Sequence, residues 1–209
     1  MSTPRRSFRR ASEEERRADL ISATQECIIQ GGIGAATTRK IADIAGVTPG
    51  LLRHYFPDKT SLLRATYQVT MSTMTQQAVQ VLEHCESTAA ARLRLFIETS
   101  LKPPVMQPRN HKLWASFTSL MNAVPEISNI HREAYLEFRN VCEALITEVF
   151  IELGRELDTQ HIKRLSIAVN ALIDGLWVEG CMAIELFDQE EFIELGVSSV
   201  QSLLKLETL

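Results

Sequence analysis

The polar residues whose spacing most suggests chemistry lie in one segment, residues 37–56, which reads TTRKIADIAGVTPGLLRHYF. At helical periodicity, several of its hydrogen-bond donors fall on one face, beside a glycine that lets another molecule approach closely. Donors of this kind suit the base edges and phosphate oxygens of DNA. The outward residues in the second half of the segment are Thr48, Pro49, Gly50, Arg53, His54 and Tyr55.

Two short helices are needed to position that face. We expect one helix over residues 38–45, ended by Gly46, and a second over residues 48–56. Thr48 and Pro49 are a strong start signal, because a threonine hydroxyl caps exposed amides and proline fits the first helical position. Two such helices joined by a glycine-containing turn are typical of a helix-turn-helix. The apolar residues expected to lock them together are Ile41, Ile44, Ala45, Val47, Leu52 and Phe56.

The next helix is expected to contribute to the same surface. Asp58 should cap it, and it should run to about residue 83. We expect Lys59 and the first amides of this helix to face the same nucleic-acid backbone, since a helix N-terminus favours an anion. The alternative is a three-helix packing unit whose polar surface binds nothing.

The rest of the chain also shows helical periodicity. Ser12 and Glu15 form a capping box at the start of the first helix, and glycines at positions 31, 32 and 34 should stop it. We see no segment with the two-residue period of a strand. Further helices are expected over residues 87–101, 110–122, 127–154, 158–186 and 189–206.

These elements predict an all-α fold with two parts. Residues 13–64 should form a three-helix helix-turn-helix domain, and residues 65–209 a helical ligand-binding and dimerisation domain. Residues 1–12 are predicted to be a disordered basic tail, because they offer little to bury.

The distribution of charge agrees with a nucleic-acid partner for the first part only. Residues 1–64 carry 11 Lys and Arg against 7 Asp and Glu, whereas residues 65–209 carry 11 against 19. A basic head on an acidic body is expected when one small domain meets phosphate and the other does not.

The sequence does not favour an enzyme. It has no G-x-S-x-G, P-loop or dinucleotide-binding motif, and its histidines and cysteines lack metal-ligand spacing. We therefore expect no catalytic residue, metal or cofactor. The four separated cysteines are expected as buried thiols in a reducing cytoplasm, with a redox-sensing pair as the alternative.

The start of the chain and its apolar runs bear on location. The opening residues are basic but precede charged residues instead of a signal peptide's apolar region. The uninterrupted apolar runs fall short of the roughly 18 residues of a membrane span. A cytoplasmic protein with no membrane partner is expected.

Aromatic residues in the second half suggest a small-molecule site. If the helix faces that carry them converge, they would enclose a carboxylate in an aromatic box, which suits a quaternary ammonium cation through cation–π attraction. The alternative is that these aromatic residues only fill the core. The candidate effector-binding residues are Trp114, Phe117, Tyr135, Phe138, Asp174 and Trp177.

The last two helices carry apolar stripes that would suit a dimer interface. Two such helices from each subunit would make a symmetric four-helix contact, and packing within one subunit is the alternative. A homodimer would place two reading helices about 34–36 Å apart, to match successive major grooves. The stripe residues are Leu165, Val169, Leu172, Ile173, Leu176, Val197, Val200, Leu203 and Leu204.

The first 65 residues resemble the TetR family of one-component regulators, through TTRKIADIAGVTPGLLRHYFPDKTSLL and the preceding helix. The resemblance implies a homodimeric repressor of a double-stranded DNA operator, released when a small molecule binds the C-terminal domain. It also implies that Thr38 and Arg39 contact DNA, together with Thr48, Gly50, Arg53, His54, Tyr55 and Lys59.

A narrower resemblance points to the effector. The same segment, KLWASF at 112–117 and ALIDGLWVEG at 171–180 are similar to choline-responsive repressors of glycine betaine synthesis genes. That resemblance implies a choline-like effector. The alternative is a repressor or activator of an unrelated pathway, such as efflux or catabolism, with a different hydrophobic or aromatic effector.

Overall fold

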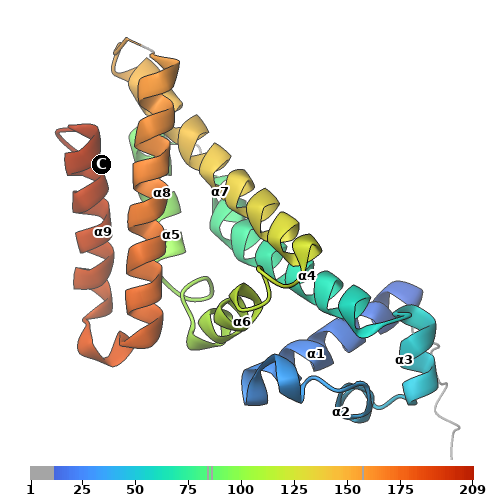
Figure 1. Ribbon diagram of the computed structural model, residues 1–209. Helices are drawn as coiled ribbons and strands as arrows, with labels where there is room; N and C mark the ends of the chain where they lie inside the picture. Colours follow the sequence, from blue (N-terminus) through green and yellow to red (C-terminus); the bar gives the residue numbers. More distant parts are fainter. Residues whose placement is uncertain (1–11, 84, 86, 157) are drawn as a thin grey trace, which may run out of the picture. The chain divides into compact units, whose positions relative to one another are not determined.

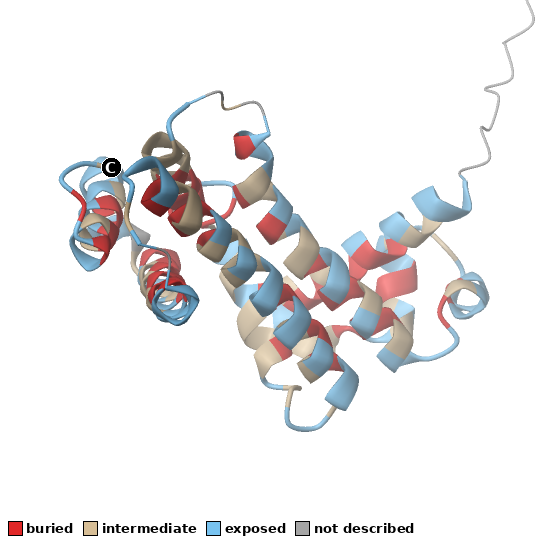
Figure 2. Cartoon of the chain, turned by 90° about the horizontal axis from the view of Figure 1, so that it is seen from above, coloured by how far each residue is buried: buried red, intermediate tan, exposed pale blue. Residues whose placement is uncertain are grey.

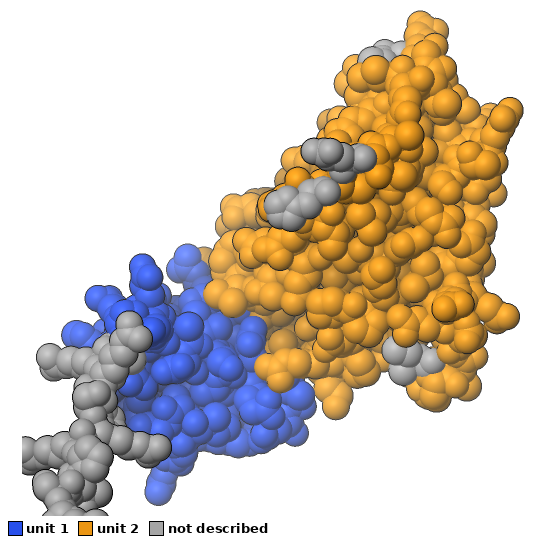
Figure 3. Space-filling view, turned by 180° about the vertical axis from the view of Figure 1, so that it is seen from behind, with its two compact units in different colours: residues 1–66 blue, residues 67–209 orange. Residues whose placement is uncertain are grey.

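The computed structural model describes residues 12–83, 85, 87–156 and 158–209, and within them every regular element is a helix (Figure 1). The chain divides into two compact units, residues 1–66 and residues 67–209 (Figure 3). The expected disordered tail, residues 1–12, lies outside the described residues except for Ser12.

The first unit contains α1 (Glu13–Ala35), α2 (Thr38–Ile44), α3 (Pro49–Tyr55) and the beginning of α4 (Lys59–Val79). The capping box predicted at α1 is confirmed, since Ser12 Oγ accepts from the Glu15 amide at 3.1 Å and Glu15 Oε2 accepts from the Ser12 amide at 2.6 Å. The buried face of α1 includes Leu20, Thr24, Cys27 and Ile28.

The end of α1 differs from the expectation. The chain leaves helical conformation at Gly31 and Gly32, where Gly32 has φ +70°, and then resumes one more helical turn to Ala35. Glycine adopts this left-handed conformation without the Cβ clash that other residues suffer. The glycines therefore break α1 near its end and do not stop it.

The second unit is built from longer helices. It holds the rest of α4 and the 3₁₀ turn η1 (Gln80–Leu82), followed by α5 (Ala89–Ser100) and α6 (Pro108–Thr118). After these come α7 (Pro125–Glu152), α8 (Thr159–Met182), the 3₁₀ turn η2 (Ile184–Leu186) and α9 (Gln189–Leu204).

The core of the second unit lies where α5, α7, α8 and α9 pack on one another. The helices bury a stripe on one side and leave the other exposed, as Figure 2 shows. Phe96, Leu93 and Val169 are fully buried in this core. Gly196 marks a close approach of α9 to α5, because a Cβ at this position would overlap the side chain of Leu101.

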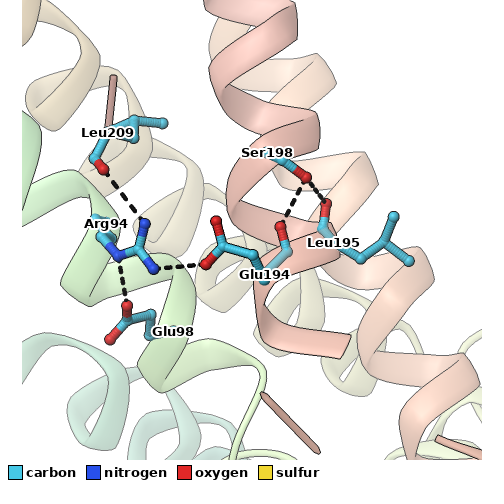
Figure 4. Close-up of polar contacts among 6 residues, drawn as sticks. All are labelled: Arg94, Glu98, Glu194, Leu195, Ser198 and Leu209. Atoms are coloured by element: carbon cyan, nitrogen blue, oxygen red, sulfur yellow. Dashed lines mark hydrogen bonds and ion pairs between the residues drawn. The ribbon is translucent and has the colours of Figure 1, made fainter. Parts of the chain in front are cut away.

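An arginine ties α5 to α9 and to the end of the chain (Figure 4). Arg94 donates to Glu98 Oε1 at 2.7 Å within α5 and to Glu194 Oε2 at 2.6 Å on α9. Its third contact is with the carbonyl oxygen of Leu209, at 3.3 Å. The last helix is thus held by polar contacts as well as by apolar packing.

The apolar stripes expected at a dimer interface face the core of their own unit instead. Six of the nine stripe residues are buried within the second unit, so their assignment to an intersubunit contact is wrong. The six are Leu165, Val169, Ile173, Val197, Val200 and Leu204. Other apolar residues of α8 and α9 are exposed, namely Ile167 and Leu195 together with Leu203 from the predicted stripe.

By length and composition alone, α8 could cross a membrane, with a mean hydropathy of 1.3 over an 18-residue window. Of that window, 44% is buried inside the structure, and α8 packs against α5, α6, α7 and α9. Its apolar composition therefore fits a core helix.

Candidate functional site

The turn between α2 and α3 is set by local capping. Thr37, one residue before the predicted start, caps α2 by accepting from the Lys40 amide at 3.3 Å. Thr48 caps α3 by accepting from the Leu51 amide at 3.2 Å. Gly46 between them has φ +64°, a conformation that favours glycine. These short-range signals fix where α3 begins.

Three of the expected apolar residues hold α3 against its neighbours, because Ile41, Leu52 and Phe56 are buried. The expectation for Ile44 is wrong, since its side chain is 43% exposed. Ala42 is buried instead, and Ile44 lies roughly 200° around the helix from it.

The outward face of α3 is open. Thr48, Pro49, Gly50, Arg53 and His54 are exposed, and Tyr55 is half-buried. The His54 and Tyr55 rings meet edge to face, with centroids 5.3 Å apart. The exposed side chains of Arg53 and His54 therefore leave hydrogen-bond donors open to a partner on the same helix as the small Gly50.

A hollow of about 200 Å³ brings together residues from three helices of the first unit. Its lining includes Thr38 of α2, Arg53 of α3 and Lys59 of α4. Arg39 lies next to this lining in sequence and is exposed. Cationic and hydroxyl groups in one hollow can hold a phosphate.

Two contacts at the start of α4 limit the groups that this helix can offer to a nucleic-acid backbone. Lys59 Nζ donates to the Ile33 carbonyl at 3.3 Å, which leaves the other ammonium protons for a partner. Asp58 Oδ1 accepts from the Ser61 amide at 2.6 Å, and this bond holds the pKa of Asp58 below its usual range. Part of the α4 N-terminus is therefore occupied by the protein's own carboxylate.

Sequence reasoning missed Arg17, which steadies the C-terminal end of α3. Its guanidinium donates to the Tyr55 carbonyl at 3.0 Å and lies 4.4 Å from the centroid of the Phe56 ring. Arginine satisfies an orphan carbonyl at a helix end and stacks well on aromatic rings. No local pattern marks Arg17, because its partners lie 38 or more residues away.

The second unit contains a cavity of about 460 Å³, which we call the ligand cavity. Five of the six candidate effector residues line it: Trp114, Tyr135, Phe138, Asp174 and Trp177. The sixth, Phe117, does not. It is fully buried and stacks on Tyr67 with ring centroids 4.5 Å apart, so it packs in the core.

Two tryptophans form one wall of the ligand cavity. The rings of Trp114 and Trp177 meet edge to face, with centroids 5.9 Å apart and planes at 78°. Trp177 Nε1 donates to the Val105 carbonyl at 3.1 Å, which fixes the orientation of its ring. Indole faces held in this way attract cations.

Two acids line the ligand cavity, the exposed Glu179 and Asp174, and only Asp174 is hydrogen-bonded to other lining residues. Asn170 Nδ2 donates to Asp174 Oδ2 at 2.6 Å, and the Tyr135 hydroxyl also hydrogen-bonds to this carboxyl. Burial raises the pKa of Asp174, and these two hydrogen bonds oppose the shift. The site thus holds a carboxyl that bears a desolvation cost until a partner compensates it.

Other residues that line the ligand cavity were not predicted from the sequence. Met71, Met74 and Thr75 come from α4, and His131 from α7. His131 Nδ1 lies 2.7 Å from the Tyr67 hydroxyl, and burial lowers the pKa of His131. A methionine or histidine on a helix face has no pattern that distinguishes a cavity wall from core packing.

The lining can bind but offers little for metal chemistry. Within residues 12–83, 85, 87–156 and 158–209, no group of three His, Cys, Asp or Glu residues could hold a metal ion. Aromatic faces, a carboxyl and an amide are instead the groups of a binding site.

Comparison with known proteins agrees with this combination of sites. Residues 20–66 match the family described as bacterial regulatory proteins, tetR family, and residues 89–205 match the family described as BetI-type transcriptional repressor, C-terminal. The HTH-type transcriptional regulator BetI of Pseudomonas fluorescens is 29% identical over 184 residues, which cover 87% of this chain and 89% of that protein.

Solved structures show the same fold. A transcriptional regulator of Pseudomonas aeruginosa PAO1 has a TM-score of 0.85 at 26% identity, over 95% of both chains. A regulator of Saccharomonospora viridis, solved in complex with choline, has a TM-score of 0.75 at 18% identity, over 90% of this chain and 96% of that one.

A helix-turn-helix unit joined to a helical unit with a ligand cavity defines a DNA-binding transcriptional regulator and not an enzyme. The chain belongs to the TetR family, and its C-terminal domain is of the BetI type.

Proposed function

We propose that this chain is a cytoplasmic homodimeric repressor that binds a palindromic operator and is released when a choline-like cation enters the ligand cavity. The observation that carries the proposal is a single cavity lined by Asp174 together with four aromatic side chains, those of Trp114, Tyr135, Phe138 and Trp177. Aromatic faces attract a quaternary ammonium, and the carboxylate adds a full opposite charge.

The comparisons support this effector. The Saccharomonospora viridis regulator of the same fold was solved with choline, and the similar Pseudomonas fluorescens protein is named BetI. A repressor that senses choline would control choline and glycine betaine metabolism.

The DNA contacts are assigned to the outward face of α3 and its neighbours. Arg53 is proposed to read a base, and Lys59 to hold a phosphate. Gly50 lets the backbone of α3 approach the groove closely. The complete set of proposed contacts is Thr38, Arg39, Thr48, Pro49, Gly50, Arg53, His54, Tyr55 and Lys59.

A homodimer is supported by exposed apolar residues on α8 and α9. Ile167 is 45% exposed and Leu195 51%. Such residues on the last two helices suit a symmetric contact between two copies, and two copies supply the two reading helices that a palindrome requires.

Choline titration tests the effector assignment. We expect a saturable change in tryptophan fluorescence at millimolar choline or below, and release of the bound operator fragment in a gel shift over the same range. Asp174→Asn should weaken choline binding about tenfold or more, because it removes the charge. Asp158→Asn makes the same change at the exposed N-cap of α8 and should have no effect. No saturable change for the natural protein would refute the choline assignment.

One observation favours a second candidate. The 460 Å³ of the ligand cavity falls in the range of roughly 300–1,000 Å³ that holds drug-sized molecules, which are larger than choline. A larger hydrophobic or aromatic effector from an unrelated pathway would also fit. Operator release by such a molecule, together with indifference to choline, would select this candidate.

A further inference from the structure

Asn170 occupies a special position in the ligand cavity. It lies on α8 one turn before Asp174, lines the cavity and is only 1% exposed. Its Nδ2 donates to Asp174 Oδ2 at 2.6 Å. An ionised carboxylate can only accept hydrogen bonds, so this contact fixes which end of the amide faces Asp174.

The other end of the same amide is unsatisfied. Asn170 Oδ1 is buried and has no hydrogen-bond partner among the described residues. Buried polar atoms in proteins are nearly always paired, because an unpaired acceptor bears its full desolvation cost. Both donors that reach Asp174, from Asn170 and Tyr135, are already engaged with the carboxyl. Because Asn170 lines the ligand cavity, a molecule bound there is a source of a donor for Oδ1.

We propose that Asn170 Oδ1 accepts a hydrogen bond from a hydroxyl group of the effector and so selects a hydroxyl-bearing quaternary ammonium. This rests on the proposed function, because it assumes that a quaternary ammonium binds beside Asp174. A quaternary nitrogen has no N–H, so the cationic end cannot satisfy the amide oxygen. Only a second polar group with a donor can do so, and a hydroxyl supplies one without adding charge.

A pair of nearly equal-sized ligands isolates this hydrogen bond. Choline and trimethyl(propyl)ammonium carry the same cationic head and differ in that a methyl replaces the hydroxyl. Calorimetric titration should give choline an affinity about tenfold higher, since the propyl ligand leaves the buried oxygen unpaired. Asn170→Leu removes the acceptor and should erase the preference. Trp114→Leu weakens the attraction for both cations and should leave the ratio between them unchanged.

The outcomes separate this inference from the proposed function. If both ligands bind the natural protein equally well, the cation site stands and the assigned role of Asn170 is overturned. The same holds if Asn170→Leu folds, as judged by circular dichroism, and still prefers choline. If Asn170→Leu does not fold, the ratio measured on the natural protein decides. If neither ligand binds at millimolar concentration, the proposed function fails and this inference fails with it.

Discussion

The recognition helix α3 and the ligand cavity are built in different ways. The helix depends on residues close together in sequence: Thr48 caps it, Gly46 turns the chain before it, and Phe56 anchors its end. The cavity is assembled from α4, α6, α7 and α8, with lining residues more than 100 positions apart. A helix that depends on neighbouring residues can be predicted from the sequence. A cavity lined by residues from distant helices can be seen only once the chain has packed.

Removing the anchor of α3 should damage the first unit and leave the ligand cavity intact. Phe56→Ala should lower the free energy of unfolding of the first unit by about 3–5 kcal/mol, because it leaves a large cavity and deprives Arg17 of its stacking partner. Operator binding should be lost, while the ligand cavity, whose lining lies wholly in residues 67–209, should keep its affinity.

Urea unfolding followed by circular dichroism measures the loss of stability. Ile44→Ala is the matched control, because Ile44 is 43% exposed and its truncation should change stability by no more than about 0.5 kcal/mol. Equal effects of the two substitutions would contradict the burial of Phe56 and the exposure of Ile44.

A second test separates base reading from phosphate binding on the outward surface. Arg53→Ala should cost about 1–3 kcal/mol of operator binding and relax the preference for sequence. Lys59→Ala should weaken all DNA sequences alike and reduce the salt slope by about one unit. Gel shifts on specific and unrelated DNA at several salt concentrations give both quantities. Identical behaviour of the two variants would show that these roles are wrongly assigned.

A smaller effect is expected from pH at the ligand cavity. Because burial raises the pKa of Asp174 in the folded state, its carboxyl becomes neutral at a higher pH than the usual value of about 3.9. Affinity for a quaternary ammonium should therefore fall as pH falls through that raised pKa. The sign for stability is opposite: the ionised carboxyl costs the unliganded protein stability above the folded pKa, and this cost is relieved as pH falls.

Calorimetric titration between about pH 8 and pH 4.5 measures this dependence. Other titratable groups also line the cavity, namely His131, Tyr135 and Glu179, and burial lowers the pKa of His131. Asp174→Asn is the control, because it removes the step due to Asp174 and retains any step due to His131. A pH profile that is the same in both proteins would assign the dependence to another group.

Aromatic residues at helical spacing predict the ligand cavity only in part. The sequence leaves open whether Trp114 and Trp177 converge or only fill the core, and in the structure their rings meet at the cavity. Phe117 was chosen on the same grounds, yet it packs on Tyr67 in the core. Helical spacing places a side chain on a face but does not say whether a neighbouring helix fills the space in front of it.

The apolar stripes of α8 and α9 likewise did not reveal what they pack against. The apolar stripes of α8 and α9 predict a dimer interface, but most of their residues are buried within their own unit. Burial within a subunit and burial between subunits require the same residue types, so the pattern cannot distinguish them.

Four features follow from the amino-acid sequence alone: the helical class, the capping box of α1, the start of α3 and its open outward face. These features depend on caps, turn glycines and periodicity, whose energies act within a few residues. Three features became visible only in the tertiary structure: Arg17 holds the end of α3, Phe117 packs in the core and does not line the cavity, and Asn170 carries an unpaired oxygen. Each of these features depends on which distant groups surround a side chain. Those neighbours are determined by the packing of the whole unit.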